Sequence, residues 1–269
     1  MESRMCAPIE EVERLERINY AATLLAAEVT PGLDVLLRDD VVIISSEVFP
    51  VSDVNHACLL RAAEQTADRL ITEVIGYFEA RGIPPLVFIS PACTPADLDA
   101  RLLDRGFARQ DTDEAWMVLR HLASFEIPSP FPGIETRKIR PDETLTVAEI
   151  FMTAFEIPVD FAPLMVQLLE PSLEIPGHNH YIALVDGRPA GVCSLICYQD
   201  VAILGSGAVL PAYRRRGVAS NMAIWSALEA LNAGADTLMV QTAAGTALER
   251  LLRISGFENV FTRTCYTLS

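Results

Sequence analysis

The residues best suited to chemistry lie in one short segment, residues 209–220, which reads VLPAYRRRGVAS. It holds three consecutive arginines in a chain whose formal net charge is −15. Gly217 and Ala219 leave the backbone bare, so a ligand can approach the main chain closely. A helix is expected to begin just after Gly217, and the free N–H groups and dipole at a helix start attract anions. The segment therefore predicts a diphosphate site made of backbone amides, to which Arg214, Arg215 and Arg216 add long-range attraction.

The strand that precedes this segment contains Gly205, Ser206 and Gly207. Two glycines inside a strand indicate a bulge or the close approach of another backbone. They fit a twisted strand that carries small residues beneath a helix. They fit equally a strand splayed from its neighbour, with N–H and C=O groups left for an extended ligand. The residues alone leave both alternatives open.

The elements that must position these residues can be predicted from apolar spacing and turn signals. Over residues 134–269 the predicted order is β-α-α-β-β-β-α-β-α-β, with 143–155 burying Leu145, Ala148, Phe151 and Met152 on one face. Asp186-Gly187 predicts a hairpin turn, and Gly234 ends the longest helix. The predicted bounds are 134–139, 143–155, 158–169, 181–185, 190–197, 202–210, 218–231, 237–241, 247–254 and 262–268.

Three prolines in residues 126–133 block both helix and central strand, so this stretch is expected to be a linker. The predicted division is a domain at 1–125, the linker at 126–133 and a domain at 134–269, each domain of normal size. The first half echoes the second: a strand at 86–90, a helix capped by Thr94-Pro95, and then matching residues. The matching pairs are Leu98/Leu248, Leu102/Leu252, Gly106/Gly256, Phe107/Phe257, Trp116/Tyr266 and Val118/Leu268.

Composition excludes several functions. The acidic surface disfavours nucleic acid and suits small cations such as protonated amines, although excess acid is also a common aid to solubility. No run reaches the roughly 18 to 20 apolar residues of a membrane span, and residues 1–17 lack the apolar core of a signal peptide. The six cysteines are scattered, as in reduced cytosolic proteins, which predicts a cytoplasmic location. Cys193 and Cys197 have no second pair nearby, so no metal is expected.

The sequence around Arg214, Gly217 and Ala219 resembles the pyrophosphate-binding signature R/Q-x-x-G-x-G/A of the GNAT acyltransferase superfamily. The resemblance covers residues 134–269 in element order. The first half resembles a degenerate copy, as in tandem-GNAT proteins, but lacks the signature. The resemblance implies an α/β fold with a mixed sheet in both halves, acyl-CoA (usually acetyl-CoA) as co-substrate, and no metal.

The resemblance also implies roles for individual residues. The N–H groups of residues 215–220 would bind the pyrophosphate, and the backbone of Val209 and Leu210 would pair with the pantetheine. The Val209 N–H would polarise the thioester carbonyl while an amine attacks directly and the CoA thiolate leaves. The cofactor-binding residues implied are Val209, Leu210, Arg214, Arg215, Arg216, Gly217, Val218, Ala219 and Ser220.

The sequence departs from the family pattern at the expected acid and base. Leu252 stands where many members carry a tyrosine that protonates the thiolate, and Gly245-Thr246 stands where they often carry an asparagine. The strand at 201–210 has no carboxylate. The substitutes considered are Asp200, Tyr198 and Ser206, or a bound water, with Asp200 equally suited to a turn.

In GNAT proteins the loop between the first two helices often lines the acceptor pocket, so the resemblance implies that the acceptor binds beside residues 155–161. Phe155 and Phe161 would flank it, and Glu156 or Asp160 would pair with a cationic amine. Aromatic packing and solvated acids explain the same residues equally well. His178 and His180, which precede a predicted strand, are expected to be loop residues.

The sequence therefore predicts an N-acetyltransferase that moves acetyl from acetyl-CoA to a primary amine of a small molecule or peptide. The alternatives are a non-catalytic acyl-CoA sensor or structural tandem module, a GNAT-fold decarboxylase acting on malonyl-CoA, and a nucleotide-phosphate binder. A homodimer is a possible assembly. The sequence does not specify the acceptor, the acyl length, the general base or whether the first half binds a ligand.

Overall fold

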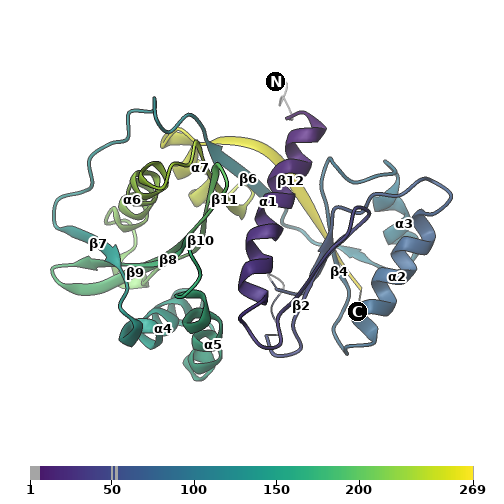
Figure 1. Ribbon diagram of the computed structural model, residues 1–269, viewed down its shortest axis with the longest axis horizontal. Coiled ribbons are helices and arrows are strands. Elements are labelled where there is room, and N and C mark those ends of the chain that lie inside the picture. The colour runs from purple at the N-terminus through teal and green to yellow at the C-terminus, as the bar shows by residue number, and fades with distance from the viewer. Residues whose placement is uncertain (1–6, 50, 52–53, 269) are drawn as a thin grey trace. The chain divides into compact units, whose positions relative to one another are not determined.

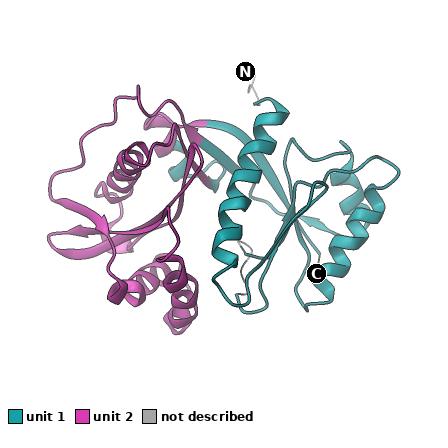
Figure 2. Cartoon of the chain, in the orientation of Figure 1, with its two compact units in different colours: residues 1–117, 242–250, 259–269 teal, residues 118–241, 251–258 magenta. Residues whose placement is uncertain are grey.

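The computed structural model describes residues 7–49, 51 and 54–268 of the chain (Figure 1). These residues fold into two units, coloured separately in Figure 2. Unit 1 is Met1–Met117, Thr242–Arg250 and Asn259–Ser269, and unit 2 is Val118–Gln241 and Leu251–Glu258. Unit 1 therefore holds segments from both halves of the chain. The expected division at residues 126–133 stays a prediction, because the units follow packing and the prediction follows chain order.

Up to residue 119 unit 1 runs in the order α-β-β-β-α-β-α-β-β, and β12 adds a strand from the second half of the chain. Its sheet has the strand order β1-β2-β3-β4-β12-β6, with β5 paired to β12, and β3 lies parallel to β4. The elements are α1 (Ile9–Ala27), β1 (Asp34–Leu37), β2 (Val42–Ser45), β3 (His56–Cys58), α2 (Ala67–Glu79), β4 (Leu86–Ile89), α3 (Leu98–Asp104), β5 (Ala108–Arg109), β6 (Glu114–Leu119) and β12 (Glu258–Thr267).

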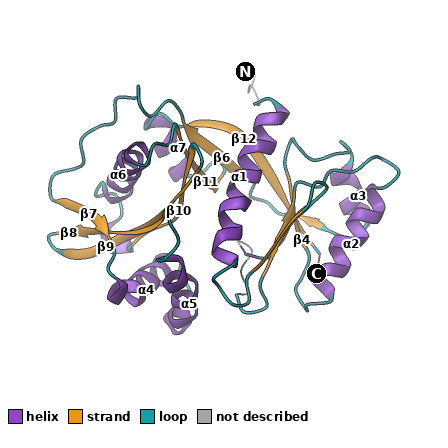
Figure 3. Cartoon of the chain, viewed as in Figure 1, coloured by secondary structure: helices purple, strands orange, loops and turns teal. Residues whose placement is uncertain are grey.

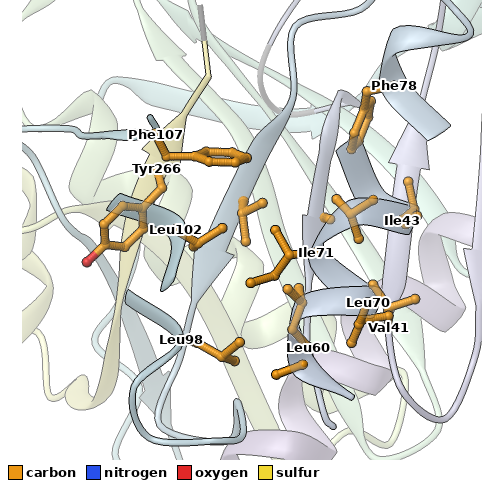
Figure 4. Close-up of a cluster of buried hydrophobic side chains, with 14 residues drawn as sticks. Val41, Ile43, Leu60, Leu70, Ile71, Phe78, Leu98, Leu102, Phe107 and Tyr266 are labelled. Atoms are coloured by element: carbon orange, nitrogen blue, oxygen red, sulfur yellow. The ribbon is translucent and has the colours of Figure 1, made fainter. Parts of the chain in front are cut away.

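The two faces of the unit 1 sheet bury different chemistry. Side chains alternate along a strand, so neighbours such as His56 and Ala57 point to opposite faces. Ala57 joins the apolar core beneath α2 and α3, which Figure 4 shows around Ile71, Leu102 and Tyr266. On the other face the His56 ring forms a 2.7 Å hydrogen bond with the Tyr20 hydroxyl of α1.

A buried ion cluster lies on the α1 face of unit 1. Arg263 of β12, 3% exposed, donates from Nη1 to Glu16 Oε1 (3.2 Å) and to the Tyr20 hydroxyl (2.7 Å). Its Nε donates to Glu114 Oε2 (2.8 Å), and Ser90 Oγ donates to Glu16 Oε2 (2.6 Å). Burial raises the pKa of Glu16, and the charge of Arg263 opposes this rise. This cluster therefore joins polar groups of the first half to Arg263 of β12, within unit 1.

Unit 2 confirms the predicted order of elements in the second half (Figure 3). Its sheet runs β11-β10-β9-β8-β7, with β10 and β11 parallel and the other neighbours antiparallel. The elements are β7 (Ile134–Lys138), α4 (Thr144–Ala154), α5 (Ala162–Ser172), β8 (His178–Val185), β9 (Arg188–Tyr198), β10 (Val201–Val209), α6 (Val218–Asn232) and β11 (Thr237–Ala243); α7 (Ala247–Ile254) and β12 follow. The fold class is the predicted mixed α/β.

Helices cover both faces of the unit 2 sheet (Figure 1). On one face, α4 and α5 pack over Ile182 and Leu184 of β8. On the other, the Tyr181 hydroxyl donates to Glu229 Oε2 of α6 at 3.0 Å. The predicted buried face of α4 is wrong at Leu145, which is 48% exposed. Because α4 packs against both the sheet and α5, it buries Val147 instead, and Leu145 in the first turn faces solvent.

The expected repeat recurs in how two helices end. After α3, Gly106 has φ 86° and the Phe107 N–H donates to the Leu102 carbonyl; after α7, Gly256 has φ 94° and the Phe257 N–H donates to that of Leu252. Glycine suits this left-handed position because it has no Cβ.

The start of α3 corrects the prediction of a Thr94-Pro95 cap, since the helix begins only at Leu98, after Asp97. The backbone of Thr94 is bonded instead to residues 60 and 62.

Three further observations concern the described residues alone. None of their helices combines the length and apolar character that crossing a membrane requires. They contain no group of three or more side chains placed to hold a metal. Cys58, Cys93, Cys193, Cys197 and Cys265 are free thiols, and Cys6 lies outside the described residues.

Candidate functional site

Strand β10 separates from β11 before it ends. Their parallel register runs from Val201↔Thr237 to Leu204↔Val240, whereas β10 continues to Val209. On its other edge β10 pairs with β9, with a register shift between Gly205 and Ala208. Ser206, exposed at φ 50°, lies in this irregularity. The two glycines therefore mark both a bulge and the place where β10 loses its parallel partner.

The backbone of Val209 faces the edge that β11 has left. The Leu210 N–H donates to the Ala190 carbonyl at 2.9 Å, and Val209 is the register partner of Gly191. Opposite residues in an antiparallel pair alternate between bonded and non-bonded pairs. Val209 is thus in a non-bonded pair with Gly191, and its N–H and C=O point away from β9. The Val209 carbonyl accepts a hydrogen bond from Arg214 Nε (3.3 Å), so a strand-like ligand could pair with this edge through the Val209 N–H.

The connection from β10 to α6 presents a run of free amides. Arg215 has φ 60° and Gly217 has φ 84°, so the backbone curls before the helix begins at Val218. The first helical bond runs from the Asn221 N–H to the Gly217 carbonyl (2.8 Å). Within the described chain, the N–H groups of residues 215–220 have no acceptor. Free amides and the positive end of the α6 dipole are both favourable to an anion, as the sequence predicted for this segment.

The three arginines differ in their contacts. Arg215 and Arg216 are exposed, and neither forms an ion pair with any described carboxylate. The Arg216 guanidinium lies 5.3 Å from the centroid of the Tyr213 ring. Arg214, by contrast, donates to two backbone carbonyls, those of Val209 (3.3 Å) and Ala154 (2.6 Å). Long-range attraction of an anion therefore falls mainly to Arg215 and Arg216.

Two residues beside this loop were missed by the sequence analysis. Asn221, fully buried in α6, accepts the Phe131 N–H (2.7 Å) through Oδ1 and donates through Nδ2 to Thr136 Oγ1 (2.9 Å). A Cβ on Gly217 would lie 3.3 Å from the Phe131 ring. The expected linker thus packs on the loop. The available signal was a lone asparagine in the first turn of a mainly apolar helix.

Comparison with known families decides what this arrangement is. Residues 144–257 match the Acetyltransferase (GNAT) family. These residues form a GNAT acetyltransferase domain. None of the curated proteins is significantly similar to the chain in sequence.

Solved structures extend the GNAT fold over both halves. A GCN5-related N-acetyltransferase from Kribbella flavida has a TM-score of 0.70 at 14% identity, covering 93% of each chain. A tandem GNAT protein from the clavulanic acid biosynthesis pathway has a TM-score of 0.58 at 14% identity, covering 94% of each. A functionally unknown protein from Staphylococcus epidermidis has a TM-score of 0.65 at 12% identity, covering 92% of this chain and 98% of that one. At such identities these likenesses establish the fold alone.

The GNAT domain separates the three candidate acid–base residues. Tyr198 and Asp200 flank the β9–β10 turn, where the Asp200 carbonyl accepts the N–H groups of Asp236 and Thr237. At about 3.3 Å per residue, Asp200 lies about 30 Å from Val209 along β10, whereas Ser206 lies about 10 Å away. Of the three, Ser206 lies nearest to Val209 along β10. Leu252 is 2% exposed and has no proton to donate.

The expected acceptor loop lies next to the diphosphate loop, because Arg214 bonds the carbonyl of Ala154. Phe155 and Phe161 are 54% and 48% exposed, and Glu156 between them has φ 59°. The Phe155 ring leans on Phe151, with centroids 4.6 Å apart. The start of this loop therefore lies at Arg214, and the loop exposes two aromatic rings.

The prediction that His178 and His180 are loop residues is wrong, because β8 begins three residues earlier than expected and includes both. His180 Nε2 forms a 2.7 Å hydrogen bond with Ser172 Oγ of α5. Burial lowers the pKa of His180 to about 4 and also lowers the pKa of His178. Among the described residues, His178 Nε2 has no hydrogen-bond partner. Burial therefore favours the neutral form of both rings, and His180 stabilises the fold through its hydrogen bond to Ser172.

Proposed function

We propose that the chain is an acyl-CoA-dependent N-acyltransferase that transfers acetyl from acetyl-CoA to a primary amine of a small molecule or peptide. The supporting observation is the run of unbonded amides at residues 215–220, next to the stretch of β10 that has no parallel partner. The amides suit a diphosphate, and the open strand edge suits the amide-bearing pantetheine. The scattered free thiols favour a cytoplasmic setting.

The chemistry needs little from side chains. The amides of residues 215–220 hold the diphosphate, and the Val209 N–H donates to the thioester carbonyl oxygen as negative charge develops there. The amine nitrogen forms a bond to the carbonyl carbon, and the C–S bond breaks with its electron pair on sulfur. The amine proton passes to water or to Ser206 as a relay.

Leu252 cannot protonate the leaving sulfur, but a thiolate with a free pKa near 8.5 leaves unaided. Positioning the two reactants can lower the barrier by roughly 7–11 kcal/mol. A general acid or base typically raises the rate by about 10²–10⁴-fold, which is a smaller contribution. Buried Leu252 therefore predicts a slow enzyme.

Two glycines at opposite ends of α6 provide a matched test. Gly217 and Gly234 both have φ 84°, so alanine strains the backbone equally at each. A Cβ at 217 would meet the Phe131 ring at 3.3 Å beside the free amides, whereas a Cβ at 234 would have open space. Calorimetric titration with acetyl-CoA should show binding weakened about tenfold or more by Gly217→Ala and unchanged by Gly234→Ala. Equal affinities in the two variants would reject the site.

A non-catalytic acyl-CoA sensor is the second candidate, because Leu252 is buried and β10 carries no carboxylate. Release of free thiol from acetyl-CoA across a panel of primary amines separates the two. Turnover with at least one amine supports the transferase. Binding without turnover on any amine supports the sensor, and carbon dioxide released from malonyl-CoA without an amine would indicate a decarboxylase.

A further inference from the structure

Arg214 fills the first fixed position of the diphosphate signature, yet its side chain bonds to the protein. Nη2 donates to the carbonyl of Ala154 at 2.6 Å, and Nε donates to that of Val209 at 3.3 Å. A guanidinium is a rigid fork of donors and can hold two carbonyls from different segments at once. Lysine, with one compact ammonium, could not span both with the same geometry.

The Ala154 carbonyl is a place where a chain needs such a donor. Ala154 is the last residue of α4, and the last four carbonyls of a helix lack partners within it. The negative end of the dipole also favours a cation there. Directly afterwards the chain turns at Glu156, where φ is 59°, and the Ile157 N–H returns to the Met152 carbonyl (2.9 Å). The guanidinium therefore fixes the point from which residues 155–161 depart.

Those residues combine exposed aromatic rings with carboxylates. Phe155, Val159 and Phe161 are exposed apolar side chains, and Glu156 and Asp160 are exposed acids on the same short loop. Exposed apolar side chains next to carboxylates on one loop suit a protonated amine that carries an apolar group. A charged polyamine or a small polar amine would use only part of this surface.

We propose that Arg214 is a positioning residue that holds residues 155–161 beside Val209, where this loop binds the acceptor, an amine with an apolar substituent. The proposal rests on the proposed function. It assigns Arg214 to acceptor binding and leaves acyl-CoA binding to the loop amides, Arg215 and Arg216.

Hydrogen exchange of the ligand-free protein tests whether Arg214 holds residues 155–161 in place. Arg214→Met should speed amide exchange in residues 155–161 about tenfold and leave exchange in β8 and β9 unchanged. Arg214→Lys should fall between it and the wild type. Arg215→Met, the neighbouring control, should leave the loop unchanged. Unchanged exchange of residues 155–161 in Arg214→Met would overturn the proposal.

Kinetics test the assigned role, with 2-phenylethylamine and ethanolamine as probe amines. Arg214→Met should raise the KM for 2-phenylethylamine about tenfold and keep the Kd for acetyl-CoA within about twofold. Arg215→Met should weaken the binding of acetyl-CoA and leave the KM for 2-phenylethylamine unchanged. Preference of the wild type for ethanolamine would overturn the acceptor class. If Arg214→Met instead lost affinity for acetyl-CoA and kept its KM for 2-phenylethylamine, Arg214 would be a residue that binds the diphosphate. If the wild type does not bind acetyl-CoA, the proposed function fails. The exchange experiment still tests whether Arg214 holds residues 155–161 in place.

Discussion

The two halves contain the same strand–loop–helix connection in two different states. In the second half, β10 outruns its parallel partner and residues 215–220 keep their amides free. In the first half, β3 lies parallel to β4, but the connection that follows is bonded to the chain itself. The Thr94 N–H donates to the Leu60 carbonyl (2.9 Å), and the Ala62 N–H donates to that of Thr94 (3.0 Å). The same element order can therefore yield an open binding edge or a closed structural one.

The charged side chains of the two connections differ in the same way. Arg61, in the first-half connection, forms an ion pair with Glu13 of α1. Arg215 and Arg216 have no such partner among the described residues. A guanidinium already paired with a carboxylate has little attraction left for a ligand phosphate. The arginine of the first-half loop is thus paired within the fold, whereas Arg215 and Arg216 would be available to the proposed ligand.

The largest expected difference between the halves is in acetyl-CoA binding: the second half should bind it and the first half should not bind it at all. Calorimetry with acetyl-CoA should give one bound molecule per chain, because Leu60, Ala62 and Thr94 occupy the edge that pantetheine would need in the first half. A second binding event per chain would contradict the closed state of that half.

The next largest effect should come from Arg263→Met. This change leaves Glu16 and Glu114 without their buried cation, which typically costs about 3–5 kcal/mol of unfolding free energy. Urea unfolding followed by circular dichroism measures the loss. As the control, Arg216→Met in the open loop should change stability by less than about 0.5 kcal/mol. Similar losses in both variants would remove the distinction between structural and ligand-facing arginines.

Lowering the pH should destabilise the second half through His180, which is buried in β8. The folded pKa of His180, about 4, lies below its ordinary 6.5, so the unfolded chain binds the proton first and stability falls with pH between these values. From pH 6.5 to 4.5 the loss is about 2 kcal/mol. Urea midpoints across this range should fall less in His180→Gln, which keeps a donor toward Ser172. An equally steep fall in that variant would assign the acid sensitivity elsewhere.

The smallest effect expected concerns salt. Exposed charges contribute weakly and are screened, so Arg216→Met should weaken acetyl-CoA binding about two- to fivefold at low salt. The difference should largely vanish near 0.5 M salt in titrations at several ionic strengths. Arg61→Met, the first-half control, should leave affinity unchanged at every salt concentration.

Local patterns predicted most of the second half, because strand alternation, helix spacing and glycine turns are written in neighbouring residues. Gly217, Gly234 and Gly256 all take the left-handed conformation at a helix boundary. The curl of residues 209–220 follows from the same local chemistry. Prediction erred by three or four residues at the starts of β8 and β12, where polar residues such as His178 are buried in a strand.

The remaining features depend on contacts between distant residues. Arg214 meets Ala154 sixty residues away, Phe131 meets Asn221 ninety residues away, and Arg263 meets Glu16 across 247 residues. No spacing rule predicts such partners. The family resemblance predicted residues 155–161 as the acceptor loop, and this stays a prediction; the hydrogen bond from Arg214 to Ala154 beside it was not predicted.

The membership of β12 in unit 1 has a mechanical consequence. The Ala7 N–H donates to the Val260 carbonyl at 3.2 Å, so segments near both termini of the described chain are joined within one unit. Unit 2 consists of two segments, Val118–Gln241 and Leu251–Glu258, and each is inserted between segments of unit 1. Force applied at the two ends of the chain should therefore act first on unit 1. Unit 2 should bear the force only after unit 1 has unfolded. Force spectroscopy should therefore release unit 1 first.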